Sequence, residues 1–180
     1  IIRMRKRLFL LLLAFISLCQ MNAVERTKLN FNGGWLLKVG DFPGAEQANY
    51  KDAGWKQITL PRAFNEKEAF KVSIEHLSDT IMWYRKHFHI QEVGDRKYFI
   101  EFEGVRYGAD IWLNGKKVGY TENGVMASGF DLTPYIIKGE NVIAVRVDNS
   151  WNYRERTSGQ RFQWNDKNFN ANYGGIPKNV

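Results

Sequence analysis

Short segments of β-strand character, separated by turn residues, are the feature that most constrains the fold of this chain. Aromatic and β-branched residues are frequent in these segments, and we find no apolar stripe of helical spacing after residue 23. The expected strands cover residues 35–39, 55–60, 82–90, 97–103, 109–120 and 141–149. Many short strands without helices between them predict an antiparallel sandwich or barrel, and hence an all-β fold.

Alternation within these segments predicts which side chains face the core. In residues 82–90 the apolar side chains share one face, namely Met82, Tyr84, Phe88 and Ile90. In residues 97–103 the inward face carries Tyr98, Ile100 and Phe102. Asn114-Gly115 divides residues 109–120 into a hairpin, because this dipeptide suits a type I′ turn. Residues 131–135 predict a local turn, and residues 174–180 resemble the start of another strand.

Residues 1–23 have the three-part pattern of a secretion signal. A positively charged segment at 4–7 (Met-Arg-Lys-Arg) precedes an apolar run at 8–18, which is short for a permanent membrane anchor. Two processing routes remain open: cleavage after Ala23, or lipidation of Cys19, the only cysteine. Both predict export, to the periplasm or to the outer membrane of a bacterium as a lipoprotein. A lipid on Cys19 is the only membrane contact that we expect.

The net charge of +7 is concentrated partly in this signal. Four basic residues lie there without an acidic one, so the remaining chain has 22 basic and 19 acidic residues, a net charge of +3. Such a small excess does not predict nucleic acid as a partner.

Several chemical constellations are incomplete. His87 and His89 share a face of a predicted strand, but no third metal ligand lies near them in the sequence. Glu66 follows Asn65 in a loop, without the opposed carboxylate that glycoside hydrolysis needs. No glycine-rich phosphate loop opens a helix. We therefore expect no catalytic residue, metal or cofactor in this chain.

The stretch from residue 150 to 175 is the strongest candidate for a binding site, because it is long, aromatic and rich in amides. Trp164 offers a platform for a sugar ring, and Asn168, Asn170 and Asn172 offer donors and acceptors for hydroxyl groups. Packing within the protein is the alternative role for each of them. Arginines of this stretch could bind an acidic group or pair with Glu155 and Asp166, namely Arg154, Arg156 and Arg161.

Four segments together resemble the N-terminal sugar-binding domain of glycoside hydrolase family 2: residues 83–88, 102–136, 140–149 and 172–180. That family includes β-galactosidases, β-glucuronidases and β-mannosidases. The resemblance implies a jelly-roll β-sandwich over residues 24–180, like galactose-binding domains. It also implies that an immunoglobulin-like domain and a (β/α)₈ barrel follow in the whole enzyme, and that both catalytic glutamates lie in the barrel.

The resemblance also implies a role for the loop before Gly175-Ile176, which in this family supplies polar side chains to the active site. Asn168 and Asn170 stand where several members have an acid, and an amide can still bond a sugar hydroxyl. The expected protein is thus an exported retaining β-glycosidase, most similar to the β-galactosidase type. Its substrate is a β-linked oligosaccharide or glycoside, and this domain docks on downstream domains of the same enzyme. A stand-alone carbohydrate-binding module and a purely supporting domain are the alternatives.

Overall fold

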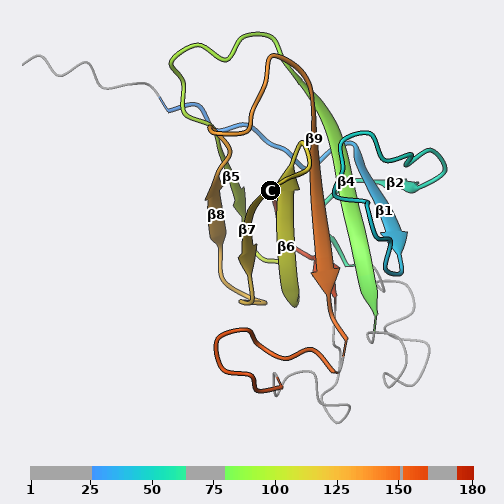
Figure 1. The fold of residues 1–180 in the computed structure, drawn as a ribbon. Coiled ribbons are helices and arrows are strands. Elements are labelled where there is room, and N and C mark those ends of the chain that lie inside the picture. The colour runs from blue at the N-terminus through green and yellow to red at the C-terminus, as the bar shows by residue number, and fades with distance from the viewer. Residues whose placement is uncertain (1–25, 64–79, 151, 162–173) are drawn as a thin grey trace, which may run out of the picture.

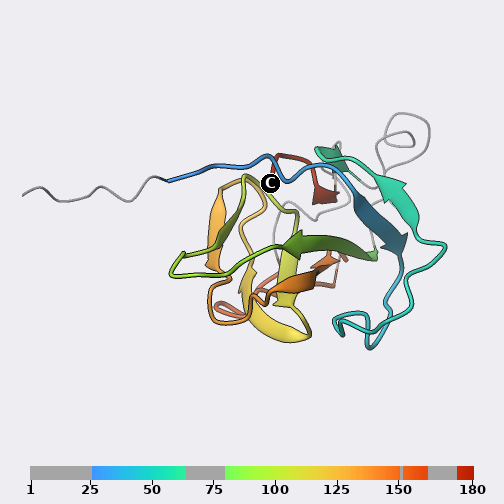
Figure 2. The ribbon, with the colours of Figure 1, turned by 90° about the horizontal axis from the view of Figure 1, so that it is seen from above.

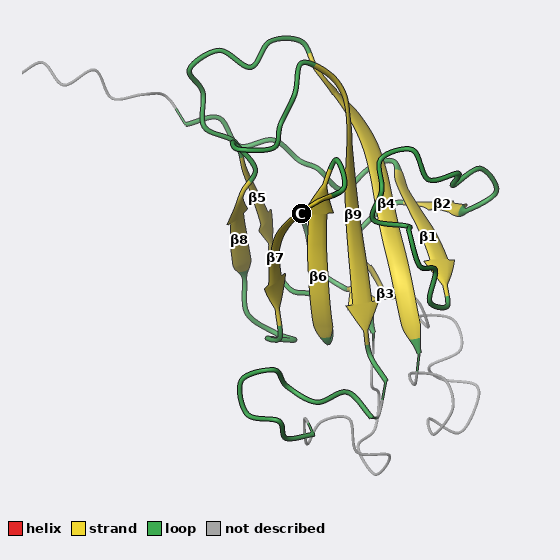
Figure 3. Cartoon of the chain, viewed as in Figure 1, coloured by secondary structure: helices red, strands yellow, loops and turns green. Residues whose placement is uncertain are grey.

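The computed structural model describes residues 26–63, 80–150, 152–161 and 174–180, and these residues form strands and loops without a helix (Figures 1 and 3). The strands are β1 (Trp35–Val39), β2 (Lys56–Ile58), β3 (Arg62–Ala63), β4 (Ile81–Ile90), β5 (Phe99–Phe102), β6 (Gly108–Leu113), β7 (Lys116–Thr121), β8 (Ser128–Asp131), β9 (Gly139–Asp148) and β10 (Gly175–Ile176). No helix of this described part is long and apolar enough to cross a membrane. The predicted secretion signal with Cys19 lies outside the described residues.

Six strands form one antiparallel sheet in the order β2-β1-β4-β9-β6-β7. Its centre is the long pair β4–β9, which runs from Ile81 opposite Asp148 to Ile90 opposite Gly139. Both strands are rich in aromatic or β-branched residues, which suit a strand flanked on both sides by neighbours.

Two short antiparallel pairs, β5–β8 and β3–β10, form a second layer over one face of this sheet (Figure 2). The main core lies between the layers and combines side chains of the sheet with those of the second layer: Trp35, Met82, Tyr84, Ile111 and Val145 with Ile100, Phe102 and Ile176. Each large apolar side chain buried in this way contributes about 1.5–3 kcal/mol to stability. This two-layered all-β arrangement is consistent with the predicted jelly roll.

The alternation predicted for β4 and β5 is confirmed. Met82 and Tyr84 are fully buried in the main core, and Phe88 and Ile90 pack against it. In β5, Ile100 and Phe102 are likewise buried, whereas Phe99 in the same strand is 66% exposed. The period of two in the sequence therefore identifies the inward face correctly.

A smaller core covers the opposite face of the sheet. Trp83 stacks on Trp112 with 5.4 Å between the ring centroids, and the connection between β1 and β2 packs over this face. Arg85 is completely buried there. Its Nε donates to Asp52 Oδ2 at 2.7 Å, and its Nη1 donates to backbone carbonyl groups of Ala45 and Gln47. The buried positive charge is thus neutralised and hydrogen-bonded.

The β6–β7 hairpin has the predicted Asn-Gly turn. Asn114 has a φ of 52° and Gly115 a φ of 79°, as a type I′ turn requires. The Asn114 side chain also links the turn to β9, because its Oδ1 accepts from Val142 N at 2.9 Å and its Nδ2 donates to Asn141 Oδ1 at 2.8 Å. The residue that forms the turn therefore also fixes it in the tertiary structure.

Two short elements, β3 and β8, differ from the sequence expectation. We expected a loop from Arg62 onward, but residues 62–63 form β3, and β8 was not expected. β8 contains Ser128, Gly129 and Asp131, so its extended form depends on pairing with β5 and not on its own composition. The strand expected within residues 174–180 is confirmed as β10, although it is only 2 residues long.

Candidate functional site

Several loops meet at one end of the sandwich. Asp148 at the end of β9 pairs with Ile81 at the start of β4 and with Gly108 at the start of β6, so these strands terminate at the same end of the sheet. The loops that follow β7 and β9 leave the sheet at this end, which is the lower end in Figure 1. Loops gathered at one end of a rigid sandwich are common sites of binding.

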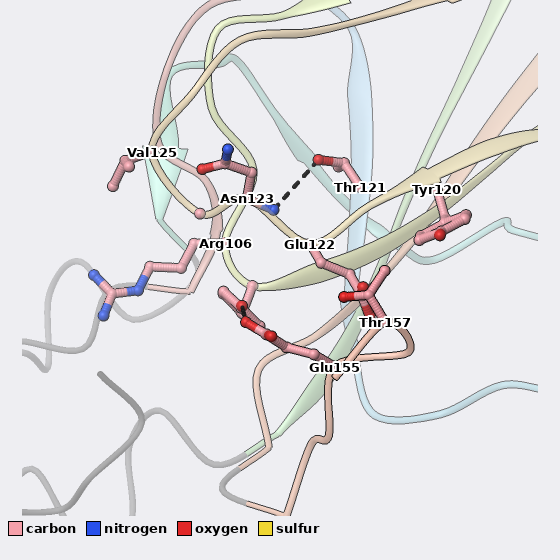
Figure 4. Close-up of a pocket in the computed structure, with 10 residues that line it drawn as sticks. Arg106, Tyr120, Thr121, Glu122, Asn123, Val125, Glu155 and Thr157 are labelled. Carbon is pink, nitrogen blue, oxygen red and sulfur yellow. Dashed lines mark hydrogen bonds between the residues drawn. The ribbon is translucent and has the colours of Figure 1, made fainter. Parts of the chain in front are cut away.

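An open pocket of about 550 Å³ lies at this end (Figure 4). This volume falls within the range of about 300–1,000 Å³ that small-ligand sites occupy. Its lining combines aromatic, amide, hydroxyl and charged groups: Arg106, Tyr107, Tyr120, Thr121, Glu122, Asn123, Gly124, Val125, Glu155 and Thr157. The peptide bond between Arg106 and Tyr107 is cis.

Two tyrosine–glutamate pairs lie at the pocket, and three of their four residues line it, namely Tyr107, Glu122 and Glu155. Tyr107 donates its hydroxyl to Glu155 Oε1 at 2.5 Å, and Tyr153 donates its hydroxyl to Glu122 Oε1. The two tyrosine rings meet edge to face, with 5.5 Å between their centroids. Gly108 makes room for this arrangement, because a Cβ there would lie 2.3 Å from Cζ of Tyr153. The two carboxylates are thus fixed through one aromatic unit.

Burial and the adjacent carboxylates set the protonation of these pairs. Burial raises the pKa of Tyr107 and of Tyr153 far above the usual value, and the bonds to Glu155 and Glu122 raise these pKa values further. The hydrogen bond from Tyr107, with a second one from Ser158, lowers the pKa of Glu155. At neutral pH the tyrosines are therefore hydroxyl donors, and Glu155 is an ionised acceptor.

An ion-pair cluster anchors the loop that carries Glu155. The Arg156 guanidinium donates two hydrogen bonds to the Asp110 carboxylate, at 2.9 and 2.6 Å, and Lys117 Nζ lies 2.7 Å from the same carboxylate. Burial alone would raise the pKa of Asp110, but the bonds and charges of Arg156 and Lys117 outweigh it and hold the pKa below its usual value. Arg156 also lies over the ring of Tyr120, 4.7 Å from its centroid.

β10 lies beside Arg106, one of the residues that line the pocket. Gly175 exchanges two backbone hydrogen bonds with Arg106, at 2.7 and 2.8 Å, and pairs with Ala63 of β3. The fully buried Tyr84 packs beneath it, and its hydroxyl accepts from Ile176 N at 3.4 Å. The position of β10 is therefore fixed from three sides.

All four residues predicted to bind substrate lie outside the described residues: Trp164, Asn168, Asn170 and Asn172. The described residues on either side of this segment both lead to the pocket. Arg161 pairs with Arg154, next to the pocket residue Glu155, and Gly175 pairs with the pocket residue Arg106.

The predicted roles of Arg154, Arg156 and Arg161 can be compared with the structure. Arg156 pairs with Asp110, a partner that the sequence did not suggest, and Asp166 lies outside the described residues. Arg154 donates to the carbonyl of Gly159 at 3.1 Å, within the loop. Arg156 therefore holds the loop in place instead of presenting its charge to a ligand.

The two histidines of β4 are both exposed. His87 lies between two carboxylates, with Nε2 2.8 Å from Asp52 Oδ2 and Nδ1 3.3 Å from Glu140 Oε1. Within the described ranges, no group of three or more His, Cys, Asp or Glu side chains could hold a metal ion. Asn65 and Glu66 lie outside these ranges.

Sequence reasoning missed Tyr107 and Glu122 as residues of the pocket. Tyr107, Glu122 and Tyr153 are distant in the chain, and only the strand order β9-β6-β7 brings them together. The available signal was the polar Glu122-Asn123-Gly124 directly after a predicted hairpin strand, since loop residues at strand ends often form sites.

Residues 25–177 match the family model described as the glycosyl hydrolase 2 galactose-binding domain-like family. The chain belongs to this family. This confirms the resemblance on which the expected fold was based. Relatives of this chain and similar solved structures indicate which kinds of enzyme carry such a domain.

Among the relatives of this glycosyl hydrolase 2 domain, a β-glucuronidase of Formosa agariphila is 38% identical over 167 residues, which cover 87% of this chain and 17% of that protein. The β-galactosidase BoGH2A of Bacteroides ovatus is 33% identical over 133 residues, covering 69% of this chain and 16% of that protein. The chain thus spans less than a fifth of the length of these relatives.

Solved structures agree with this assignment. A β-glucuronidase from glycoside hydrolase family 2 superimposes with a TM-score of 0.70 at 34% identity, over 86% of this chain and 18% of that one. Bacteroides uniformis β-glucuronidase 2, covalently bound to cyclophellitol-6-carboxylate aziridine, gives a TM-score of 0.72 at 25% identity, over 86% and 17% of the two chains.

Proposed function

We propose that this domain is the N-terminal part of an exported, retaining β-glycosidase that hydrolyses O-glycosidic bonds. The observation that carries the proposal is the family match over residues 25–177, together with the 38% identity to a β-glucuronidase over 87% of the chain. Catalysis by double displacement needs two carboxylates about 5–5.5 Å apart. We place them in a barrel outside residues 1–180, as the family resemblance implies.

The role of this domain is to supply one wall of the substrate site and to dock on the catalytic barrel. Asn168, Asn170 and Asn172 would bond sugar hydroxyls, and Trp164 would stack on a sugar ring. The described surroundings support this assignment, because the residues on both sides of that segment lie beside a pocket of suitable size.

Two sugar classes are candidates for the cleaved sugar, the one whose own glycosidic bond is hydrolysed. The sequence pattern favours a β-galactoside, and a relative named β-galactosidase is 33% identical. The relative with 38% identity is named β-glucuronidase, which favours a β-glucuronide. Both classes therefore belong in the same assay.

The test uses protein expressed from the complete reading frame that contains this chain. Hydrolysis of an aryl β-galactoside or an aryl β-glucuronide at a steady rate is the expected result, and the ratio of the two kcat/KM values assigns the sugar. A protein that hydrolyses neither substrate but binds neutral oligosaccharides in calorimetry would instead be a carbohydrate-binding module.

A further inference from the structure

Neutral groups donate the described hydrogen bonds to the two pocket carboxylates, Glu122 and Glu155. Glu122 accepts from the Tyr153 hydroxyl and from Arg156 N at 2.8 Å, and Glu155 accepts from Tyr107 and from Ser158 Oγ at 2.8 Å. All four donors are neutral groups. No ion pair between either glutamate and a described basic side chain is present.

The basic side chains near the pocket are directed elsewhere. The Arg156 guanidinium is held by Asp110, on the outer face of the sheet. Figure 4 shows the guanidinium of Arg106 turned away from Glu122 and Glu155. The two pocket carboxylates therefore have no ion pair with a described basic side chain, and the charge of Arg156 reaches Glu122 only at longer range.

These acceptors retain bonding capacity. An ionised carboxylate has about four lone-pair sites, and each of the two glutamates receives two described hydrogen bonds. The neighbouring Asn123 and Thr157 add neutral donors and acceptors, and Val125 adds an apolar edge. Tyr107 and Tyr153 hold the carboxylates in place, so the acceptors are fixed before a ligand binds.

We propose that this pocket binds a neutral sugar unit of the substrate through hydroxyl groups that donate to Glu122 and Glu155, and that it rejects a uronic acid in the same place. The proposal rests on the proposed glycosidase function and extends it from the cleaved sugar to the sugar that leaves. A sugar carboxylate placed here would meet two negative charges, whereas each sugar hydroxyl can donate to a charged acceptor. The specificity follows from the lone pairs of Glu122 and Glu155 that can still accept a hydrogen bond beside those from Tyr153 and Tyr107.

The experiment compares three substrates of the full-length enzyme that share the cleaved sugar. One has an aryl leaving group, one a neutral leaving sugar and one a uronic acid leaving sugar. Thr157→Phe fills the pocket, and Glu155→Gln removes one charge while its amide oxygen can still accept from Tyr107. The matched controls are Gln91→Phe and Glu92→Gln, which are exposed and follow the opposite end of β4.

For Thr157→Phe we expect KM for the neutral disaccharide to rise about tenfold, the loss of about 1.4 kcal/mol of binding, with the aryl substrate unchanged. For Glu155→Gln we expect the preference for the neutral over the uronic acid leaving sugar to fall about tenfold or more. Equal effects of either variant on all three substrates would indicate a structural role and overturn the proposal, as would the absence of any effect.

A second measurement separates this proposal from the proposed function. If the full-length protein hydrolyses no β-glycoside, the glycosidase function fails, and calorimetry with lactose then tests the pocket alone. Binding that Thr157→Phe abolishes and Gln91→Phe preserves supports the pocket. Equal binding by both variants, or binding of an amino sugar in place of lactose, contradicts it.

Discussion

The hydroxyl of Tyr84 lies so close beneath Gly175 that a Cβ on this glycine would stand 2.1 Å from it. Gly175 also has a φ of +105°, a conformation that other residues rarely adopt. This contact places β10, which follows the predicted substrate-contacting segment in the sequence, against the main core. The packing of β10 and its pairing with the pocket residue Arg106 therefore both depend on Gly175.

Replacing Gly175 by alanine should lower the free energy of unfolding by about 2–4 kcal/mol, because the new methyl group overlaps a buried hydroxyl and the backbone is strained. Chemical denaturation measures this change. Tyr84→Phe removes the overlapping oxygen, so it should restore part of the loss when combined with Gly175→Ala. A wild-type stability for Gly175→Ala would contradict the contact.

Tyr107→Phe should destabilise the domain by about 1–2 kcal/mol, since it removes the donor to Glu155 in a partly desolvated pair. Tyr120→Phe is the matched control, because no hydrogen bond of the Tyr120 hydroxyl is part of the described network and its side chain is 44% exposed. Thermal unfolding of the two variants compares them. Equal midpoints would show that the hydroxyl of Tyr107 has no anchoring role.

Asp110→Asn should show a pH-dependent loss of stability. The pKa of Asp110 is below its usual 3.8 in the folded state, so its ionised form stabilises the fold above that pH, and this contribution disappears as the pH falls through the lowered pKa. At pH 7 we expect a difference of about 1–2 kcal/mol from wild type, because Arg156 and Lys117 are 40% and 50% exposed and solvent screens them. Urea denaturation at pH 7 and below pH 3.8 measures both values. A difference that persists unchanged in acid would contradict the ion-pair account.

Asn114 combines a backbone role and a side-chain role that two variants can separate. Asn114→Gly keeps the positive φ but loses the bonds to Val142 and Asn141, whereas Asn114→Ala loses both. We expect Asn114→Gly to cost about 1–2 kcal/mol and Asn114→Ala about 1 kcal/mol more. Indistinguishable unfolding curves for the two variants would contradict a separate backbone contribution.

Much of the fold could be predicted from the sequence where one local signal determines the structure. The alternation in β4 identifies the buried face from Met82 to Ile90, and Asn114-Gly115 identifies the hairpin, because both patterns act over a few residues. β3 and β8 were not predictable in this way. Each is short and exists through its partner, Gly175-Ile176 or β5.

The candidate site was predictable only in part, for the same physical reason. The sequence directs attention to the loop after β9, where Glu155 and Arg156 do lie at the pocket or anchor it. It does not show that Tyr107 and Glu122 join this loop, because that contact requires the strand order of the folded sheet. The partner of Arg156, Asp110, lies 46 positions away and was missed for this reason.

The most direct measurement of the central claim is the steady-state hydrolysis of an aryl β-galactoside and an aryl β-glucuronide by the full-length protein and by its Asn168→Ala and Asn170→Ala variants. The account predicts that the wild type hydrolyses at least one of the two substrates. It also predicts that kcat/KM falls about tenfold or more in at least one variant, as loss of a sugar hydrogen bond requires. Unchanged kcat and KM in both variants would reduce this domain to a support for the barrel, and a wild type inactive on both substrates would contradict the glycosidase assignment.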